Sequence, residues 1–352
     1  MSVPPPPSDV ARSPGDPAPV AQRHASARGP QFSWSESRAR LLRRCRRAYY
    51  LSYYAAHEGW RAPAGTTSWL AYRLKKLTTL PALVGVAVHR AASTCARTLA
   101  AGGPLPSYRA LRATAAAELN GGWRQARDGI TAFLRRPAAV CMLDEFLYGH
   151  GPDAQALDRA RAVLDGSLRA LTTVDALWDG VRRAAPEDVI VLDPFWHFEL
   201  PPDGTTVFAA PDLLVRPARD ARWEVTDFKS GRPDHVIDQL LTYAVAAREG
   251  LGLDADDGMV GRVVALSGSP GERETTVLLT TDDLEAASAR IRDGVGAMHA
   301  LLRDVRRNLP LAADAFAPAT NPATCRTCAF RGLCHPDDFP SRLTGAVGSA
   351  AP

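Results

Sequence analysis

Two aspartates and a lysine on neighbouring predicted strands constrain this chain more than any other feature. Asp212 lies in PDLLVR, Asp227 and Lys229 lie in WEVTDFKSG, and the segment PARDAR between them is rich in arginine, aspartate and proline. That composition predicts a turn, so we expect the flanking runs to be adjacent strands of a hairpin. Because side chains alternate along a strand, Asp227 and Lys229 share one face and Phe228 points into the core. The two carboxylates would hold Mg²⁺ or Mn²⁺, hard cations that prefer oxygen ligands, with the Phe228 carbonyl as a further candidate ligand.

The composition of the chain makes Lys229 more informative. Of the 42 basic residues only Lys75, Lys76 and Lys229 are lysines, so arginine is used almost wherever a positive charge is enough. A lysine can orient or deprotonate an attacking water and can stabilise charge developing on a phosphate, whereas a guanidinium stays protonated. The pattern therefore favours a site that cleaves phosphodiesters. The alternative is an ordinary ion pair between Asp227 and Lys229, because short motifs recur freely.

The segment that follows this strand, GRPDHVIDQLLTYAVAAREG, is predicted to be an amphipathic helix. Gln239 and Tyr243 are four residues apart, so they share one face of that helix and can reach back toward the acids. An amide and a phenol in that position could orient a water or a phosphate. The alternative is a capped helix whose polar residues are incidental.

His89 occupies an unusual position, on the apolar helical stretch PALVGVAVHRAASTCARTLA. Gly85 lies one turn earlier, where the missing side chain would allow another element to approach closely. A single histidine on an apolar face is more often a hydrogen-bonded core residue than a ligand. Beside the two acids, however, His89 becomes a candidate third metal ligand.

The cysteines predict a second site. Cys325, Cys328 and Cys334 stand close together in CRTCAFRGLC, and Cys45, 280 positions before Cys325, is the natural fourth ligand. Four thiolates bind either Zn²⁺ or an iron-sulfur cluster, and the arrangement of three local ligands and one distant ligand leans toward a [4Fe-4S] cluster. A disulfide framework is not expected, since the chain is long and shows no secretory signal. The remaining cysteines, Cys95 and Cys141, are expected to be buried small hydrophobes.

Six elements in this order resemble the PD-(D/E)XK nuclease superfamily, in its RecB-like branch with a cysteine cluster. That branch includes AddB-type nuclease domains and CRISPR-associated adaptation exonucleases. The resemblance covers roughly residues 31 to 335, and its elements are SWSESRARLLRRCRRAYYLSYY, GVAVH, PDLL, DFK, QLLTY and CRTCAFRGLC. One departure is that Ala209 and Ala210 stand where a glycine is often found upstream of PDLL.

The resemblance implies the fold and the roles of individual residues. The implied fold is α/β, with a restriction-endonuclease-like central mixed sheet flanked by helices, a large helical insert and a C-terminal cysteine-cluster segment. The implied metal ligands are His89, Asp212 and Asp227, with catalysis assisted by Lys229 and supported by Gln239 and Tyr243. The implied cofactors are Mg²⁺ or Mn²⁺ and a [4Fe-4S] cluster on Cys45, Cys325, Cys328 and Cys334, with Zn²⁺ as the alternative there.

The domain organisation predicted from the chain is a single nuclease domain over residues 31–335. Residues 1–30 are rich in proline and are expected to be disordered, and residues 336–352 are expected to be a flexible tail. Residues 67–184 are predicted to be a helical insert with interruptions at GGP, NGG and HGPDA. Residues 188–280 are predicted to be the sheet region, with VIVLDPFWHFEL and TTVFAAPDLLVR as its first two strands. No apolar run reaches the length of a membrane span, so we expect a cytoplasmic protein.

The expected partner is DNA, either single-stranded or at duplex ends. Six arginines between Arg38 and Arg47 stand directly before four tyrosines between Tyr49 and Tyr54, a combination that suits phosphates and unstacked bases. The alternative is a solvated helical face whose tyrosines pack inward. No GxxxxGK[ST] loop occurs, so unwinding would need a separate helicase or a recombination or defence protein. The two functions that remain are a metal-dependent DNA nuclease, acting as an exonuclease or on single strands and ends, and a catalytically silent DNA-end-binding module.

Overall fold

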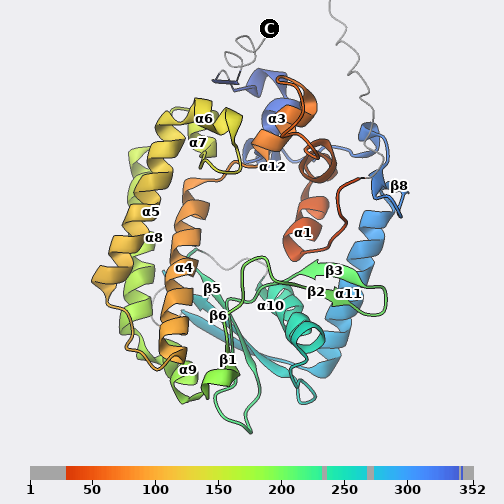
Figure 1. Ribbon diagram of the computed structural model, residues 1–352. Coiled ribbons are helices and arrows are strands. Elements are labelled where there is room, and N and C mark those ends of the chain that lie inside the picture. Colours follow the sequence, from red (N-terminus) through yellow and green to blue (C-terminus); the bar gives the residue numbers. More distant parts are fainter. Residues whose placement is uncertain (1–28, 232–235, 268–272, 341, 344–352) are drawn as a thin grey trace, which may run out of the picture.

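The computed structural model describes residues 29–231, 236–267, 273–340 and 342–343 (Figure 1). The tail expected over residues 1–30 lies outside the described residues except for Gly29 and Pro30, which hydrogen bond to Arg307 and Asn308. Residues 336–340 and 342–343 continue past the expected boundary, and Leu343 is buried in the core. No helix in the described part of the chain is long and apolar enough to cross a membrane.

A five-stranded mixed sheet forms the centre of the fold, in the order β1-β4-β5-β6-β7. Its strands are β1 (Val189–Ile190), β4 (Leu213–Val215), β5 (Glu224–Lys229), β6 (Met259–Ala265) and β7 (Glu274–Leu279). The predicted hairpin is confirmed, because β4 and β5 are adjacent and antiparallel, with Leu213 opposite Thr226. The pair β5 and β6 is parallel, so the chain must cross over between them, and helix α10 (Val236–Val245) makes that crossover.

Helices cover both faces of this sheet (Figure 1). Helix α4 (Leu80–Ala100) lies against β5, and α5 (Tyr108–Asp128) and α8 (Ala154–Thr173) lie on the outer side of α4. Helix α10 covers the other face and packs against α11 (Thr281–His299). Serine, threonine or aspartate caps begin the longest helices, which is the expected start signal. The helices of the insert are α3 (Thr67–Leu74), α4 (Leu80–Ala100), α5 (Tyr108–Asp128), α6 (Ile130–Arg135), α7 (Asp144–Leu147), α8 (Ala154–Thr173), the 3₁₀ turn η2 (Asp175–Trp178) and α9 (Asp179–Arg183).

The remaining elements lie at the two edges of this core. The N-terminal ones are α1 (Glu36–Arg44), α2 (Arg46–Tyr50) and the π-helical turn η1 (Leu51–Ala55). A 3₁₀ turn, η3 (Pro186–Asp188), precedes the sheet, and a π-helical turn, η4 (Ala246–Gly250), extends α10. The C-terminal ones are β8 (Leu302–Asp304), β9 (Leu309–Pro310), η6 (Ala313–Ala315), α12 (Pro322–Arg326), α13 (Arg331–Cys334) and η7 (Pro336–Asp338).

Two strands expected to be continuous are each divided between two sheets. Residues 189–200 give β1 in the central sheet and β2 (His197–Leu200) in a separate hairpin with β3 (Thr205–Phe208). The break falls at Asp193 and Pro194, where the Asp193 side chain accepts a hydrogen bond from the backbone N–H of Phe195 at 2.8 Å. The second run, TTVFAAPDLLVR, breaks between β3 and β4, where Pro211 has no N–H for a backbone hydrogen bond to a neighbouring strand.

One predicted interruption of the insert is wrong, because Asn120, Gly121 and Gly122 lie inside α5. A Cβ added at Gly122 would stand 3.1 Å from a methyl group of Leu83 and 3.4 Å from the Cys141 sulfur. The glycine is therefore a point of close helix packing, and the sequence pattern alone does not separate that role from a turn.

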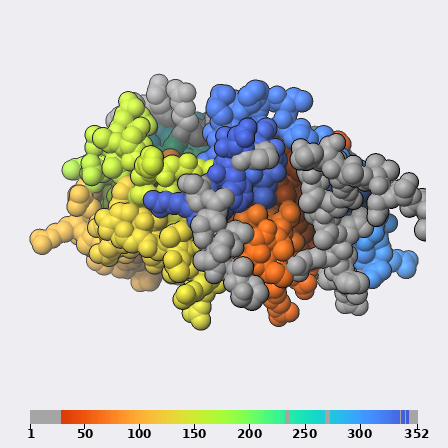
Figure 2. All heavy atoms as spheres, turned by 90° about the horizontal axis from the view of Figure 1, so that it is seen from above, coloured from red at the N-terminus to blue at the C-terminus, as the bar shows by residue number. Residues whose placement is uncertain are grey.

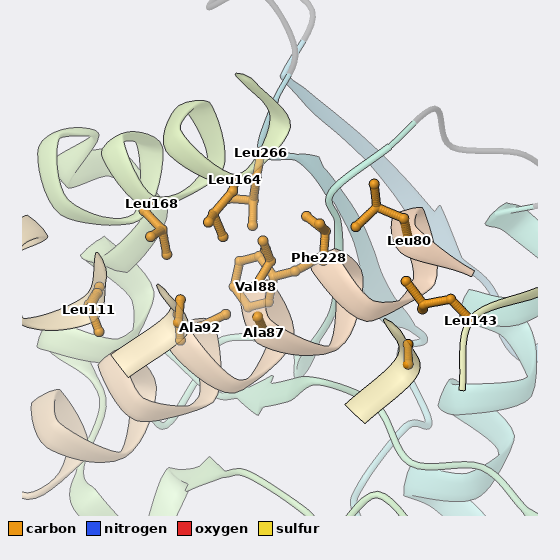
Figure 3. Close-up of a cluster of buried hydrophobic side chains, with 14 of the residues drawn as sticks. Leu80, Ala87, Val88, Ala92, Leu111, Leu143, Leu164, Leu168, Phe228 and Leu266 are labelled. Atoms are coloured by element: carbon orange, nitrogen blue, oxygen red, sulfur yellow. The ribbon is translucent and has the colours of Figure 1, made fainter. Parts of the chain in front are cut away.

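Two hydrophobic clusters hold the layers together. The first joins the insert helices to one face of the sheet, and Figure 3 shows Phe228 of β5 against Val88 of α4 within it. Phe228 is buried as predicted. The second cluster contains Val225 of β5 and Leu240 of α10 on the opposite face. Since Asp227 and Lys229 alternate with Phe228, they face the α10 side of the sheet.

Candidate active site

Four elements bring the predicted site residues together. Asp212 is the residue before β4, Asp227 and Lys229 lie in the second half of β5, and Gln239 and Tyr243 lie on α10. Helix α4 brings His89 in from the insert. A Cβ added at Gly85, one turn before His89, would lie 3.4 Å from the Ser230 hydroxyl, an ordinary contact distance. The helix therefore approaches the end of β5 closely, as predicted, but an alanine would fit.

Asp212 connects α4 to β5. Its Oδ1 lies 2.9 Å from Nδ1 of His89, and its Oδ2 accepts the backbone N–H of Phe228 at 2.7 Å. These contacts orient the carboxylate toward the segment that carries Asp227. The Phe228 backbone thus contributes an N–H donor to Asp212, a contact that the sequence did not predict.

Asp227 and Lys229 form an ion pair, with Oδ2 of Asp227 2.7 Å from the lysine Nζ. Asp227 is only 1% exposed. Burial raises its pKa to about 6, and the charge of Asp212 acts in the same direction, although Lys229 and His89 oppose it. The chain therefore keeps a poorly solvated carboxylate beside a lysine, which is costly unless a positive charge is present.

Lys229 is held from a second side by α10. Its Nζ donates to Oε1 of Gln239 at 3.0 Å, and the Gln239 amide in turn contacts the hydroxyl of Tyr243 at 2.5 Å. Burial raises the pKa of Tyr243, and the charges of Asp227 and Asp212 act in the same direction, so the phenol stays neutral. These contacts bring the predicted helix residues directly to the lysine ammonium.

The imidazole of His89 responds to the acids around it. Burial alone would lower the pKa of His89, but the hydrogen bond to Asp212 and the charges of Asp212 and Asp227 raise it above its ordinary value. The histidine therefore serves as a positively polarised partner for Asp212.

The side chains at this site fit a hard divalent cation in their chemistry. Two carboxylates and an imidazole suit Mg²⁺ or Mn²⁺. Among the described residues, no three histidine, cysteine or acidic side chains already converge on one ion position. At this site His89 lies against an oxygen of Asp212, and Lys229 lies against an oxygen of Asp227.

The four predicted cluster cysteines line one cavity of about 160 Å³. Burial raises the pKa of Cys328, as do Cys45 and Cys325, so these thiols lie within electrostatic reach of one another. The backbone N–H of Ala48 also contacts the sulfur of Cys45 at 3.4 Å. Cys95 is fully buried and Cys141 partly buried, both away from this cavity.

Four thiols that line one cavity suit the two occupants that the sequence allows, a zinc ion or an iron-sulfur cluster.

The cysteine segment is also bound to two distant parts of the chain. Arg44 of α1 donates to the Thr327 hydroxyl at 2.7 Å. Arg331 forms a bidentate pair with Asp144 of α7 and stacks over the ring of Tyr148 at 3.4 Å. Figure 2 shows the C-terminal residues, in blue, beside the orange and yellow parts of the N-terminal half. The Arg44 contact joins the segment that carries Cys45 to the C-terminal cysteine segment, and the Arg331 contacts join the latter to α7.

The arginine and tyrosine segment follows the inward-packing alternative for its tyrosines. Tyr49 is fully buried, and the Tyr54 hydroxyl donates to Asn308 at 3.2 Å. Arg38 is buried as well and lies over the ring of Tyr53 at 4.1 Å. Arg40, in contrast, remains exposed and borders a second cavity beside the active site. The exposed Phe195 on the same cavity was not predicted, because its segment was taken as part of a strand.

Comparison with known proteins agrees with this geometry. The family model that matches the chain is described as the PD-(D/E)XK nuclease superfamily, and it covers residues 33–335. No curated protein matches the chain.

Proposed function

Since the chain belongs to the PD-(D/E)XK nuclease superfamily and has its restriction-endonuclease-like mixed sheet, we propose that it is a Mg²⁺- or Mn²⁺-dependent deoxyribonuclease. One observation carries the proposal. A continuous set of contacts links His89, Asp212, the Phe228 backbone and Asp227 to Lys229, and continues through Gln239 to Tyr243. A site whose ion pairs served only stability would not need a buried acid, a lysine and an amide oriented toward that lysine.

His89, Asp212 and Asp227 would hold the cation, with the Phe228 carbonyl as a further oxygen ligand. When bound, the cation would polarise the phosphate and lower the pKa of the attacking water. Lys229 and His89 lie against those oxygens, so both side chains would have to shift for the carboxylates to hold a cation, and the Lys229 ammonium would then be available to the substrate.

Lys229 would act on the reacting phosphate. Its side chain is 21% exposed, so it reaches the surface of the site while its Nζ donates a hydrogen bond to Gln239. From this position Lys229 can donate to a phosphate oxygen as negative charge develops there, or orient the attacking water. Tyr243 fixes the Gln239 amide and so determines which way its oxygen faces. Gln239 and Tyr243 are therefore positioning residues for the lysine.

The cysteine cavity would hold a [4Fe-4S] cluster with a structural role, and Zn²⁺ is the alternative occupant. Its position supports that role, because the segment that carries Cys325, Cys328 and Cys334 packs against both α1 and α7. A cluster bound by Cys45 would lock these segments around the sheet. These features together support a place in the RecB-like branch, and a thiolate-bound cluster fits a reducing cytoplasm.

The proposed activity is tested by incubating end-labelled single- and double-stranded DNA with anaerobically purified protein in Mg²⁺, Mn²⁺ or chelator. We expect metal-dependent cleavage that Lys229→Ala and Asp212→Asn abolish. Asp314→Asn, at an exposed aspartate, is the control and retains cleavage. Cleavage that survives Lys229→Ala contradicts the mechanism.

The same experiment separates the second candidate function. Binding of DNA ends without cleavage in either metal would favour a catalytically silent end-binding module that works with a repair or defence partner. Iron and sulfide analysis of the same sample tests the cluster, and a colourless protein that contains zinc would overturn that assignment. The size of the labelled products gives the polarity, and thereby shows whether the enzyme acts as an exonuclease.

A further inference from the structure

A second cavity, of about 340 Å³, adjoins the active site on the side of α10. Gln239 and Tyr243, which orient Lys229, form one of its walls, and Ala210, two residues before Asp212, lies on another. The residues that face them come from α1, from the turn before β2 and from the end of β3. The volume falls within the range of roughly 300–1,000 Å³ that small-molecule sites occupy.

Two phenylalanines border this cavity without being buried in it. Phe195 is 79% exposed and Phe208 is 39% exposed. Phe195 lies on a tight turn that the Asp193 side chain fixes by accepting the Phe195 N–H at 2.8 Å. Phe208 is held in the β3 ladder opposite His197, and the two rings lie 5.0 Å apart. Burial of a phenylalanine side chain stabilises a protein by about 2–3 kcal/mol, and an exposed ring does not contribute this free energy. We therefore expect a ligand to cover these two rings when it binds.

The charge of the cavity comes from one arginine. Arg40 of α1 is exposed, and within the described part of the chain it forms no salt bridge. Glu36, the acid in the same wall, already pairs with Arg43 and with Arg290 at 2.8 Å each. The unneutralised charge that faces the cavity is therefore positive, and the hydroxyl of Ser37 lies beside it as a further donor.

We propose that this cavity is a subsite for one unpaired nucleotide of the substrate strand, next to the scissile phosphate. The base packs against Phe195 and Phe208, and its phosphate meets Arg40 and Ser37. Aromatic rings of this kind bind bases by their faces, without regard to sequence. A base stacked within a duplex cannot reach the rings, so the subsite selects a single strand or a frayed end. This inference rests on the proposed nuclease function, because Gln239 and Tyr243 are shared by both sites.

Other occupants explain fewer of these features. A small anion would use Arg40 but would have no need of two exposed rings. An apolar ligand would use the rings but would leave the arginine beside it unsolvated and unpaired. A nucleotide uses both, and it enters from the strand that the neighbouring site would cleave.

The subsite is tested by binding and by cleavage. Fluorescence anisotropy with labelled single-stranded DNA in chelator gives the affinity without any turnover. A single abasic residue is then moved along the strand, one position at a time. For the wild-type protein we expect about a tenfold loss of affinity at one position and little loss elsewhere, from the value of one base–aromatic stack. Phe195→Ala and Phe208→Ala are expected to weaken binding of the intact strand by a similar factor and to remove the dependence on position.

Two variants control for unfolding and for general effects. Phe195→Trp keeps a ring at the same position and should retain affinity, and Leu278→Ala removes another exposed apolar side chain, on β7 and outside the cavity. In cleavage, Phe195→Ala should raise KM about tenfold with kcat within about twofold.

Failure of the subsite and failure of the nuclease give different results. Equal affinity for every abasic strand, or equal behaviour of Phe195→Ala and Leu278→Ala, overturns the subsite even if the enzyme cleaves. Absence of cleavage by the wild-type protein overturns the nuclease, while the anisotropy still decides the subsite.

Discussion

Asp227→Asn should make the metal-free protein more stable at neutral pH while abolishing its activity. Asp227 is almost fully buried and its pKa is raised to about 6, compared with about 4 for an unfolded chain. An acid whose pKa is raised by folding destabilises the folded state once it ionises. The penalty is absent below pH 4, grows between pH 4 and 6, and is constant above pH 6.

The size of the effect follows from the shift. About two pKa units correspond to about 3 kcal/mol, and this figure is already net of the attraction to Lys229, which lowers the same pKa. Asparagine resembles the protonated carboxyl in shape and has no charge to bury. At pH 8 the variant should therefore gain up to about 3 kcal/mol, or a melting temperature higher by several degrees.

The assay is urea unfolding of anaerobically prepared protein, with the divalent cation chelated, at pH 5 and pH 8. Asp314→Asn, at an exposed site, controls for a general change in charge. The comparison between variant and wild type removes the contribution of all other titrating groups. A variant that is no more stable than wild type at pH 8, or that gains as much at pH 5, would refute the reasoning.

Three further predictions concern the metal, the lysine and the cysteine segment. Lys229→Ala should reduce kcat by a factor of about 10²–10⁴ with DNA affinity in chelator unchanged, and single-turnover kinetics beside anisotropy check this. Mg²⁺ should raise the melting temperature more at pH 8 than at pH 5.5, because the raised pKa values of His89 and Asp227 mean that protons compete with the cation. An increase in melting temperature that becomes smaller as the pH rises contradicts the site. Asp144→Ala should lower the free energy of unfolding by about 3 kcal/mol, since it leaves the largely buried Arg331 without its bidentate partner, and unfolding curves measure this loss. The variant should also lose iron faster in air, which the rate of iron release measures.

The sequence predicted those parts of the site that depend on local geometry. Asp227 and Lys229 share a face because a strand alternates, and Gln239 and Tyr243 share one because a helix repeats every 3.6 residues. These rules need no knowledge of the rest of the fold. The contact between His89 and Asp212 spans 123 positions, so no local rule predicts it. The position of a histidine on an apolar helical stretch made His89 a candidate ligand, and the family resemblance implied the same role.

The parts that sequence reasoning missed depend on contacts between distant segments. The run 189–200 looked like one strand, but β2 joins a sheet to which Trp34 also bonds, through Thr206. Gly122 looked like a helix break because its packing partner, Leu83, lies on another helix. The exposed position of Phe195 followed from the same turn that divides the strand, and Asp193 followed by Pro194 was the available signal.

The choice between inward-facing tyrosines and a DNA-binding surface was also decided at long range. Tyr50 packs on Phe316, with ring centroids 4.8 Å apart, and Tyr54 reaches Asn308. Neither partner is close in sequence. Local pattern therefore left two alternatives that only the packing of the C-terminal segment could separate.

The most direct test of the account is to locate Mn²⁺ in crystals by its anomalous scattering. We predict one strong peak bound by Asp212 and Asp227, with His89 as a ligand and with Lys229 moved off the Asp227 carboxylate. Asp212→Asn crystals should lack that peak. A peak elsewhere, or an unchanged Asp227–Lys229 pair in crystals of the active protein with saturating Mn²⁺, would contradict the assignment of this site.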